Sequence, residues 1–460
     1  MGFTLKTSGF FLLLLLLSGV AMSATPEAAH QEVKDNAPAD NGELQSTDSE
    51  VLPRLETALD RTIANYQAAI AEREANYGPF DQELSEMSYG LGNTLFLSLR
   101  FPEAMMAYQR AMHLDRVNQG VYSLGQEPML RGIIATQQAM GEPDATSETY
   151  LQLLWLYSKA YGDTDPRMIP ILDEASRWHM QAYSASGMRD DVFHLHMARG
   201  FSTHAINIAT EHFGESDLRL VGLLQNTALA NYYLEQHQKS YPGVAGWEDT
   251  EAMFDRLPNI EWIPQELYWR RNFSREGRKA CKKMISILEN NPAASPQDKA
   301  RGYVANGDML LLLNKPKSAI KSYQRAQLLL EQEAQDKPMI EELFGAPKML
   351  PQPRSAPIPS VPENISQPVD DDTKLSFADF VGESVDPLPL PTPKEYVMVA
   401  VDVSEKGTPD NINIVSIHAD ETEGMEKRAR RAITGSRFRP RFENGSPVTT
   451  QALPVKVLMN

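Results

Sequence analysis

Apolar residues recur at helical spacing over most of the chain, from about Val51 to Gln335. They stand mostly three or four positions apart, as in the buried stripe of an amphipathic helix. Runs of β-branched residues are few, and short breaks fall at glycine and proline. We therefore predict an all-α domain over residues 51–335.

Two stretches of this domain share a finer pattern of small and aromatic residues. Each begins with glycine, followed by alanine twelve positions later, tyrosine four later and alanine three later. The positions are Gly92, Ala104, Tyr108 and Ala111 in the first stretch, and Gly307, Ala319, Tyr323 and Ala326 in the second. Small residues let two antiparallel helices approach closely, and the tyrosine fills the space beside them. These stretches resemble tetratricopeptide repeats, whose helix-turn-helix units carry such residues at these offsets.

The resemblance implies stacked helix pairs whose surface binds other proteins. Between the two stretches the pattern fades, although an aromatic residue followed by glycine recurs at the end of a helical pattern. The three places are Tyr77-Gly78, Tyr161-Gly162 and Phe213-Gly214. Their irregular intervals favour degenerate repeats of varied length. Helical hairpins that merely look alike are the alternative, and they lead to the same helical architecture.

Near the C-terminus the pattern changes to alternation of apolar and polar residues, which predicts strands. The predicted elements are strands Val397–Val403, Ile412–His418 and Val448–Leu458, with a basic helix around 424–435 before the last strand. Pro454 cannot donate to a strand ladder, so the last strand should lie at an edge or carry a bulge. Residues 395–460 are therefore predicted as a small α+β domain, an antiparallel sheet covered by one helix.

The order of motifs in this domain resembles the C-terminal domain of TonB, the periplasmic protein that couples inner-membrane energy to outer-membrane receptors. The resemblance is carried by Arg437-Phe438-Arg439-Pro440, then Asn444-Gly445-Ser446-Pro447-Val448, then the closing apolar strand. It implies that an extended receptor peptide is added as a further strand. The edge implied for that role comprises Val455, Lys456, Val457 and Leu458. Arg437 and Arg439 are further candidates for partner contact, and a structural arginine beside Phe438 is the alternative.

Residues 336–394, between the two domains, are predicted as a proline-rich linker. Twelve prolines fall between Lys337 and Lys394, a density that prevents helix and sheet. A polyproline II chain of this length would reach on the order of 150 Å, so the C-terminal domain would be tethered to the helical one.

The N-terminus predicts export. Lys6, an apolar run over residues 9–22 and small residues before Ala24 are typical of a signal peptide, residues 1–23. Residues 24–50 hold seven acidic side chains and predict a disordered acidic leader. The expected location is the periplasm. The alternative is an inner-membrane anchor formed by residues 9–22, and membrane contact is expected only if that segment is retained.

Charge and chemistry narrow the function further. The formal net charge of −17 argues against nucleic acid as a partner. Cys281 is the single cysteine, so no internal disulfide can form, and its helical setting predicts a structural role. The chain holds no phosphate-binding loop, nucleophile elbow or zinc-type Cys/His spacing. The densest histidine group does not place three ligands on one helical face; it comprises His194, His196, His204 and His212. No metal, no cofactor and no enzymatic activity are therefore expected.

The leading hypothesis is a multidomain, non-enzymatic periplasmic adaptor. It would bind proteins through its helical-repeat body and its TonB-like domain, and a part in energy-coupled outer-membrane transport is implied by the resemblance alone. The alternative is a repeat-type envelope scaffold or assembly factor unrelated to transport. An enzyme that uses the helical body is the third hypothesis, and it would need an acid–base cluster in a deep pocket.

Overall fold

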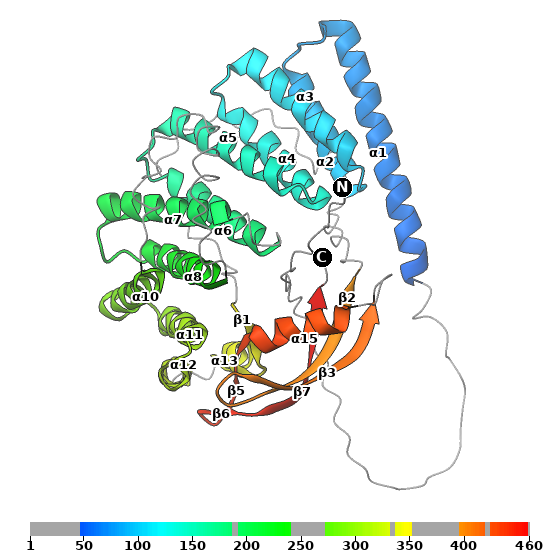
Figure 1. The fold of residues 1–460 in the computed structure, drawn as a ribbon. Helices are drawn as coiled ribbons and strands as arrows, with labels where there is room; N and C mark the ends of the chain where they lie inside the picture. The colour runs from blue at the N-terminus through cyan, green and yellow to red at the C-terminus, as the bar shows by residue number, and fades with distance from the viewer. Residues whose placement is uncertain are drawn as a thin grey trace, which may run out of the picture. The chain divides into compact units, whose positions relative to one another are not determined.

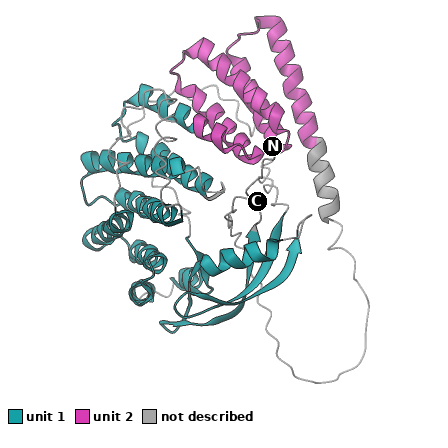
Figure 2. Ribbon diagram, viewed as in Figure 1, with its two compact units in different colours: residues 1–14, 150–367, 391–460 teal, residues 15–149, 368–390 magenta. Residues whose placement is uncertain are grey.

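The computed structural model describes residues 47–185, 192–240, 272–331, 336–351, 395–418 and 424–458. These residues form two compact units, coloured separately in Figure 2. We call residues 47–149 the N-terminal unit, and the described residues from 150 onward the C-terminal unit.

The N-terminal unit is helical throughout. It contains α1 (Thr47–Tyr77), α2 (Glu83–Leu97), α3 (Phe101–Gln119), the short 3-10 helix η1 (Leu124–Gln126), α4 (Glu127–Met140) and the start of α5 (Pro143–Tyr161). Consecutive helices pack against each other from α1 to α4. The α2–α3 hairpin buries Leu95, Ala104 and Tyr108 in its core.

The C-terminal unit also contains a helical part, whose elements are labelled in Figure 1. It comprises the rest of α5, then α6 (Met168–Ala185), α7 (Val192–Phe213), α8 (Arg219–Ser240), α10 (Phe273–Asn290), α11 (Pro296–Leu312), α12 (Pro316–Leu330) and α13 (Lys337–Phe344). From α6 to α12, each of these helices packs on the next one along the chain. The predicted helical body is confirmed. Among the helices of the described residues, none combines the length and the apolar character needed to cross a membrane.

A repeated turn accounts for the aromatic-glycine pairs. The glycine that ends α5, Gly162, has φ +96°, a conformation that side chains with a Cβ rarely adopt. Arg167 then lies 3.8 Å from the centre of the Tyr161 ring and donates to both oxygens of Asp165. The turn after α7 repeats this geometry with Phe213, Gly214, Asp217 and Arg219, and the turn after α1 uses Tyr77, Gly78, Asp81 and Arg73.

The C-terminal module, residues 395–458, is a small α+β fold, as predicted. Its elements are β2 (Tyr396–Val403), β3 (Pro409–His418), α15 (Met425–Gly435), β4 (Arg437–Arg439), β5 (Arg441–Glu443), β6 (Ser446–Val448) and β7 (Thr450–Leu458). The main sheet is antiparallel with strand order β3-β2-β7. Met425, Ala429 and Ile433 of α15 pack on the valines of β2 and β7. Pro454 lies in an edge strand that also carries a bulge, in agreement with the sequence argument.

The predicted linker begins later than residue 336. Helix α13 and the short strand β1 (Lys348–Leu350) occupy the first part of that segment. Pro338 stands in the first turn of α13, where its missing N–H costs no hydrogen bond. Ile340, Leu343 and Phe344 pack into the core of the neighbouring helices, and this burial outweighs the local density of prolines. Residues 352–394 of the predicted linker lie outside the described residues.

The predicted acidic leader, residues 24–50, overlaps the first helix. Helix α1 begins at Thr47, so the last four residues of the predicted leader, 47–50, belong to that helix and not to a disordered segment. Short helical turns extend when the following helix is already nucleated, because each added residue gains a backbone hydrogen bond. The predicted signal peptide and the rest of the leader, residues 1–46, lie outside the described residues.

Candidate functional site

The first candidate site is the outer edge of β7. In the described part of the chain, β7 pairs with β2 alone, in a regular register from Val401↔Leu453 to Tyr396↔Leu458. The side chains of Val455 and Val457 point into the core of the module and are 3% and 0% exposed. A partner at this edge would therefore meet the backbone of the strand and the side chains of its opposite face.

Pro454 indicates which backbone groups face outward. In an antiparallel ladder, residues whose N–H and C=O groups point to the neighbouring strand alternate with residues whose groups point away. Proline lacks the N–H, so it is tolerated where that group would point away from β2. Lys456 and Leu458 lie two and four positions after Pro454, so the same alternation points their N–H and C=O groups away from β2, toward the open edge.

Two bulges end the regular part of the sheet, and Asp402 of β2 holds both. Its Oδ1 accepts a hydrogen bond from the Ala452 N–H of β7 at 2.8 Å, and its Oδ2 accepts one from the Asn411 Nδ2 of β3 at 2.7 Å. Ala452 and Asn411 have φ of +51° and +44°. The Asn411 side chain and the Ala452 backbone lower the pKa of Asp402, so the carboxylate is charged at neutral pH.

The opposite edge, formed by β3, is less suited to strand addition. Helix α15 packs mainly against β3, and the Arg430 guanidinium donates to the Ile412 carbonyl. The register of β3 against β2 also shifts twice, between Met398 and Val399 and between Ala400 and Asp402. A bulged strand with an occupied carbonyl makes a poor template for another strand.

The face of the sheet opposite α15 carries a row of three side chains from its three strands. The rings of Tyr396 and His418 are stacked, with centroids 4.4 Å apart and an interplanar angle of 21°. The Lys456 Nζ lies 4.0 Å from the centre of the Tyr396 ring. Lys456 is therefore the charged side chain of this row that lies on the edge strand β7.

The second candidate site is a buried arginine that joins the C-terminal module to the helices. Arg439 of β4 is 5% exposed, and its Nε and Nη2 donate to Asp308 of α11 at 2.9 and 2.6 Å. Its Nη1 donates to the Leu343 carbonyl at 3.0 Å. The guanidinium is paired inside the chain, so Arg439 is not available for contact with a partner. It is the structural arginine beside Phe438 that was the alternative prediction.

Arg437, the other arginine of the candidate set, lies at the start of β4. It is half-buried and stands opposite Leu350 of β1, and its Nη1 donates to the Ser436 carbonyl at 3.0 Å. Its role in partner contact stays a prediction.

The C-terminal module and the helices also exchange core residues. Strand β1 pairs antiparallel with β4, which places Met349 in the core of the C-terminal module. Phe442 of β5 enters the helical core instead, where its ring meets those of Tyr323 and Phe344 with centroids 5.7 and 5.3 Å away. The Gln324 Nε2 of α12 donates to the Gly445 carbonyl at 3.1 Å. The C-terminal module is therefore docked on α11, α12 and α13, and the predicted tethered arrangement is wrong for these residues.

The residues of the two sequence repeats form matching slots. A Cβ added at Gly92 would lie 2.7 Å from the Tyr108 ring, and one added at Gly307 would lie 2.3 Å from the Tyr323 ring. Tyr108 donates to Asn93 at 2.8 Å, and Tyr323 donates to Asp308 at 2.8 Å. The alanines Ala104, Ala111, Ala319 and Ala326 are each 0% exposed between the paired helices. Burial and the neighbouring Asp308 charge raise the pKa of Tyr323, which keeps its hydroxyl a donor.

Comparison with known proteins identifies the C-terminal module. Residues 395–457 match the family model described as Gram-negative bacterial TonB protein C-terminal. The resemblance to the TonB C-terminal domain is thereby confirmed for this module. No curated protein matches the chain. Among solved structures, the crystal structure of BtubC (BKLC) from P. vanneervenii is similar at a TM-score of 0.35 and 12% identity, covering 70% of this chain and 98% of that one.

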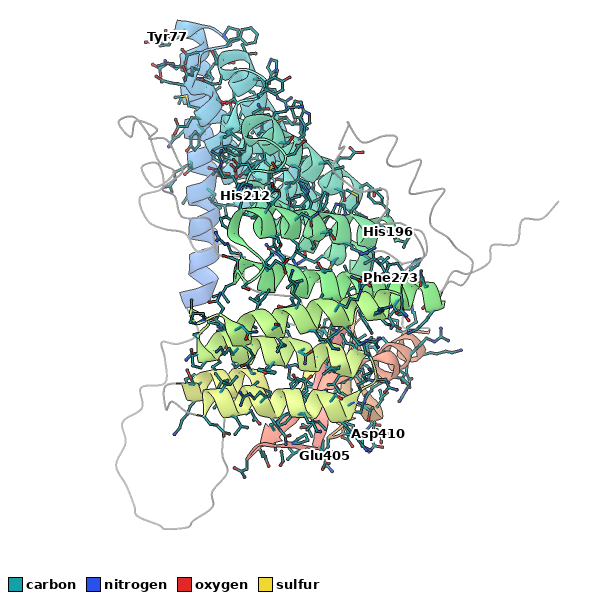
Figure 3. All side chains as sticks on the ribbon, turned by 90° about the vertical axis from the view of Figure 1, so that its left-hand side faces the viewer. Tyr77, His196, His212, Phe273, Glu405 and Asp410 are labelled. Atoms are coloured by element: carbon teal, nitrogen blue, oxygen red, sulfur yellow. The ribbon has the colours of Figure 1, made fainter. Side chains whose placement is uncertain are left out.

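The four histidines singled out in the sequence all lie on α7 and do not come together as one site. His196 and His212 lie near opposite ends of α7 (Figure 3). The Nε2 atoms of His204 and His212 lie 2.8 and 2.9 Å from the backbone oxygens of Asp163 and Thr164. Burial lowers the pKa of His196 to about 4, so it is neutral at pH 7. Within the described ranges, no group of three or more His, Cys, Asp or Glu side chains is placed to hold a metal ion.

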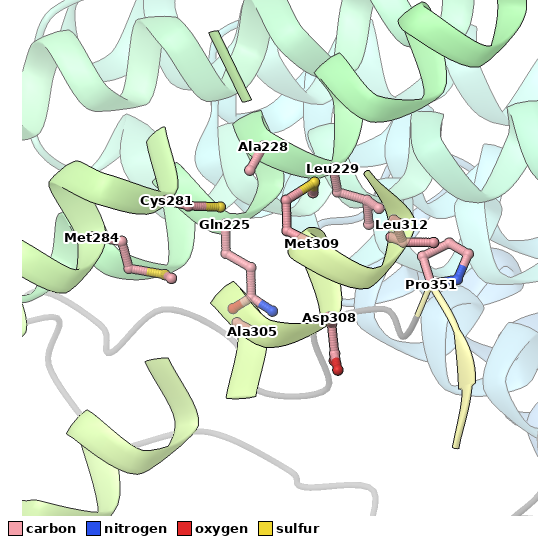
Figure 4. Close-up of a pocket in the computed structure, with 10 residues that line it drawn as sticks. All are labelled: Gln225, Ala228, Leu229, Cys281, Met284, Ala305, Asp308, Met309, Leu312 and Pro351. Atoms are coloured by element: carbon pink, nitrogen blue, oxygen red, sulfur yellow. The ribbon is translucent and has the colours of Figure 1, made fainter. Parts of the chain in front are cut away.

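Cys281 is buried next to a small cavity of about 30 Å³ (Figure 4). Residues of α8, α10 and α11 line this cavity, together with Pro351. Burial raises the pKa of the Cys281 thiol to about 12, so the thiol is protonated at neutral pH and unreactive. A cavity of this size holds about one water molecule and is far smaller than a substrate pocket.

Sequence reasoning missed Asp308 as the partner of Arg439. One signal was present, because Asp308 follows the repeat glycine Gly307 where the neutral Asn93 follows Gly92. A charge at a position expected to be partly buried calls for an opposite charge nearby. No local pattern singled out Arg439, 131 residues away, among the arginines of the chain.

Proposed function

We propose that this protein is a non-enzymatic, periplasmic protein-binding adaptor, and that its C-terminal module takes an extended peptide as a fourth strand beside β7. The observation that carries the proposal is the regular edge over residues 453–458, which has no partner strand in the described part of the chain. The family match over residues 395–457 supports protein partners of the cell envelope, such as outer-membrane receptors.

The edge also suggests which peptide is preferred. Backbone hydrogen bonds to Lys456 and Leu458 would give affinity that depends little on sequence. Side chains on one face of the added strand would lie beside Lys456, whose ammonium group forms no salt bridge with any described residue. Opposite charges on neighbouring strands contribute roughly 0.2–1 kcal/mol, so a peptide with an acidic side chain at this place is favoured modestly.

Photo-crosslinking in cells tests the proposed edge. A photoreactive amino acid replaces the exposed Pro454 on β7 in one variant and the exposed Val415 on β3 in another. We expect a discrete envelope-protein adduct from position 454 and none from position 415. Adding Lys456→Pro should abolish the adduct because it removes an outward N–H, whereas Lys456→Thr keeps that N–H and should retain most of it.

The same adduct from both positions, or none from position 454, would overturn strand addition at β7. Uptake of receptor-dependent nutrients in a strain lacking the protein then tests the transport role. Loss of uptake supports coupling to transport.

A scaffold or assembly role unrelated to transport is the second candidate. It is favoured by the docking of the C-terminal module, because β1, Asp308 and Phe344 hold that module on the helices. A docked module does not reach away from the helical body along a linker. Unchanged nutrient uptake together with a retained adduct at position 454 would favour this candidate.

A further inference from the structure

The last helical hairpin of the described chain, α11–α12, has one face that a following hairpin would cover in a longer array. In the N-terminal unit the equivalent face of α2–α3 is covered by the next helix along the chain. A Cβ added at Gly132 of α4 would lie 2.6 Å from the Tyr108 ring, so α4 packs directly on that tyrosine. Stacked helical units need such a neighbour, because one hairpin cannot bury its apolar face alone.

On the α11–α12 hairpin, α13 and the C-terminal module cover this face together. The Tyr323 ring, which corresponds to Tyr108, meets Phe344 of α13 and Phe442 of β5. The Asp308 carboxylate, which corresponds to the Asn93 amide, is paired with Arg439 of β4. An aromatic ring and a guanidinium from the end of the chain therefore lie beside α13, in the place that α4 alone takes on Tyr108 in the first hairpin.

We propose that the C-terminal module has a second function besides peptide binding: it is the cap of the helical array, held by non-covalent contacts that do not require the connecting segment 352–394. Its docking surface is the slot formed by Asp308, Tyr323, Gln324 and Phe344. The segment that fits this slot is an arginine-bearing strand followed by an aromatic residue, Arg439 to Phe442. This inference uses β4 and β5 and not the β7 edge, so it does not depend on the proposed peptide binding.

Three kinds of contact make this docking specific. The Arg439–Asp308 pair is bidentate and buried, with side chains 6% and 14% exposed. A guanidinium sealed from water with one carboxylate and one backbone carbonyl as acceptors is costly to undock, because both charges lose their partner. The β1–β4 pairing and the Phe442 ring add backbone hydrogen bonds and apolar burial on either side.

Cleavage of the connecting segment tests the cap in the full-length protein. A recognition site for a specific protease is inserted between residues 352 and 394, the purified chain is cut, and size-exclusion chromatography is run at micromolar concentration. We expect the two fragments to elute together. Separate elution of the fragments from the parent chain would overturn the proposal.

Two variants define the contact. Arg439→Met should weaken the association of the cut fragments by more than about a hundredfold, since it leaves Asp308 without its charge partner. Arg431→Met removes an exposed arginine from α15 and should leave the association unchanged. Equal elution of the Arg439→Met fragments and the parent fragments would also overturn the proposal.

A milder variant guards against misfolding of Arg439→Met. Gln324→Ala removes the hydrogen bond to the Gly445 carbonyl and should weaken the association several-fold while β2, β3 and β7 keep their amide protection.

Hydrogen exchange measures whether the docked module stabilises the helices that it covers. After release of the fragment, protection should fall in α11 and α12 and persist in α6 and α7, and unchanged protection in α11 and α12 would show docking without capping.

Discussion

The two hairpins α2–α3 and α11–α12 carry the same slot and use it differently. In both, a glycine lets a tyrosine ring lie against the facing helix, and the tyrosine hydroxyl donates to the residue after that glycine. The acceptor is the neutral amide of Asn93 in the first hairpin and the carboxylate of Asp308 in the second. The first slot is closed by the next helix, α4, whereas the second receives an arginine beside α13.

The two hairpins show how a helical array is continued and how it is ended. Asn93 needs no charged partner, and its hairpin is continued by α4. Asp308 in the corresponding place is 14% exposed, so its charge requires the Arg439 guanidinium. The charge therefore selects a specific segment of the chain, whereas apolar packing alone would accept many surfaces.

The largest expected effect comes from exchanging the two acceptors. Asp308→Asn keeps an acceptor for Tyr323 but leaves the buried Arg439 without a charge partner, which should lower the free energy of unfolding by about 3–5 kcal/mol. Chemical denaturation of the full-length protein, followed by circular dichroism, measures this loss. The converse change, Asn93→Asp, places a charge at a half-buried position and should cost about 1 kcal/mol or less. Equal losses for the two variants would contradict the assigned role of Asp308.

The glycines of the two slots should have the next largest effect. Gly92→Ala and Gly307→Ala each drive a methyl group into a tyrosine ring, at 2.7 and 2.3 Å, which costs about 3 kcal/mol when the ring cannot move away. Both variants should unfold at lower denaturant concentration. Amide exchange in β4 and β5 distinguishes the two variants. Gly307→Ala should accelerate this exchange because it shifts Tyr323, whereas Gly92→Ala should leave it unchanged. Accelerated exchange in β4 with Gly92→Ala would show that the slots are not independent.

The smallest effect concerns the tyrosine hydroxyls. Tyr108→Phe removes a hydrogen bond to a neutral amide and should cost about 1 kcal/mol, whereas Tyr323→Phe removes one to a carboxylate and should cost about 2 kcal/mol. Thermal unfolding of the two variants side by side gives the difference. A larger loss for Tyr108→Phe than for Tyr323→Phe would reverse the ranking of the two acceptors.

The architecture of the separate parts follows from local patterns in the sequence. Helical spacing specified the hairpins, alternation of Val397, Val399, Val401 and Val403 specified β2, and Pro454 specified an edge strand. Asn444 and Gly445, both with positive φ, form the two-residue turn between β5 and β6 that this dipeptide favours. These features are local, because each depends on the conformational preference or burial of residues close together in the chain.

The docking of the C-terminal module on α11, α12 and α13 depends on tertiary contacts that no local pattern predicts. Asp308 and Arg439 form one ion pair although they are 131 residues apart, and β1 pairs with β4 across the proline-rich segment. Neither contact leaves a periodic pattern in the sequence, since a single charge or a three-residue strand has none. The density of prolines after residue 336 predicted a tether because proline restricts the backbone locally. The burial of Phe344, Met349 and Phe442 outweighs this preference, since it joins the core of the C-terminal module to the core of the helices.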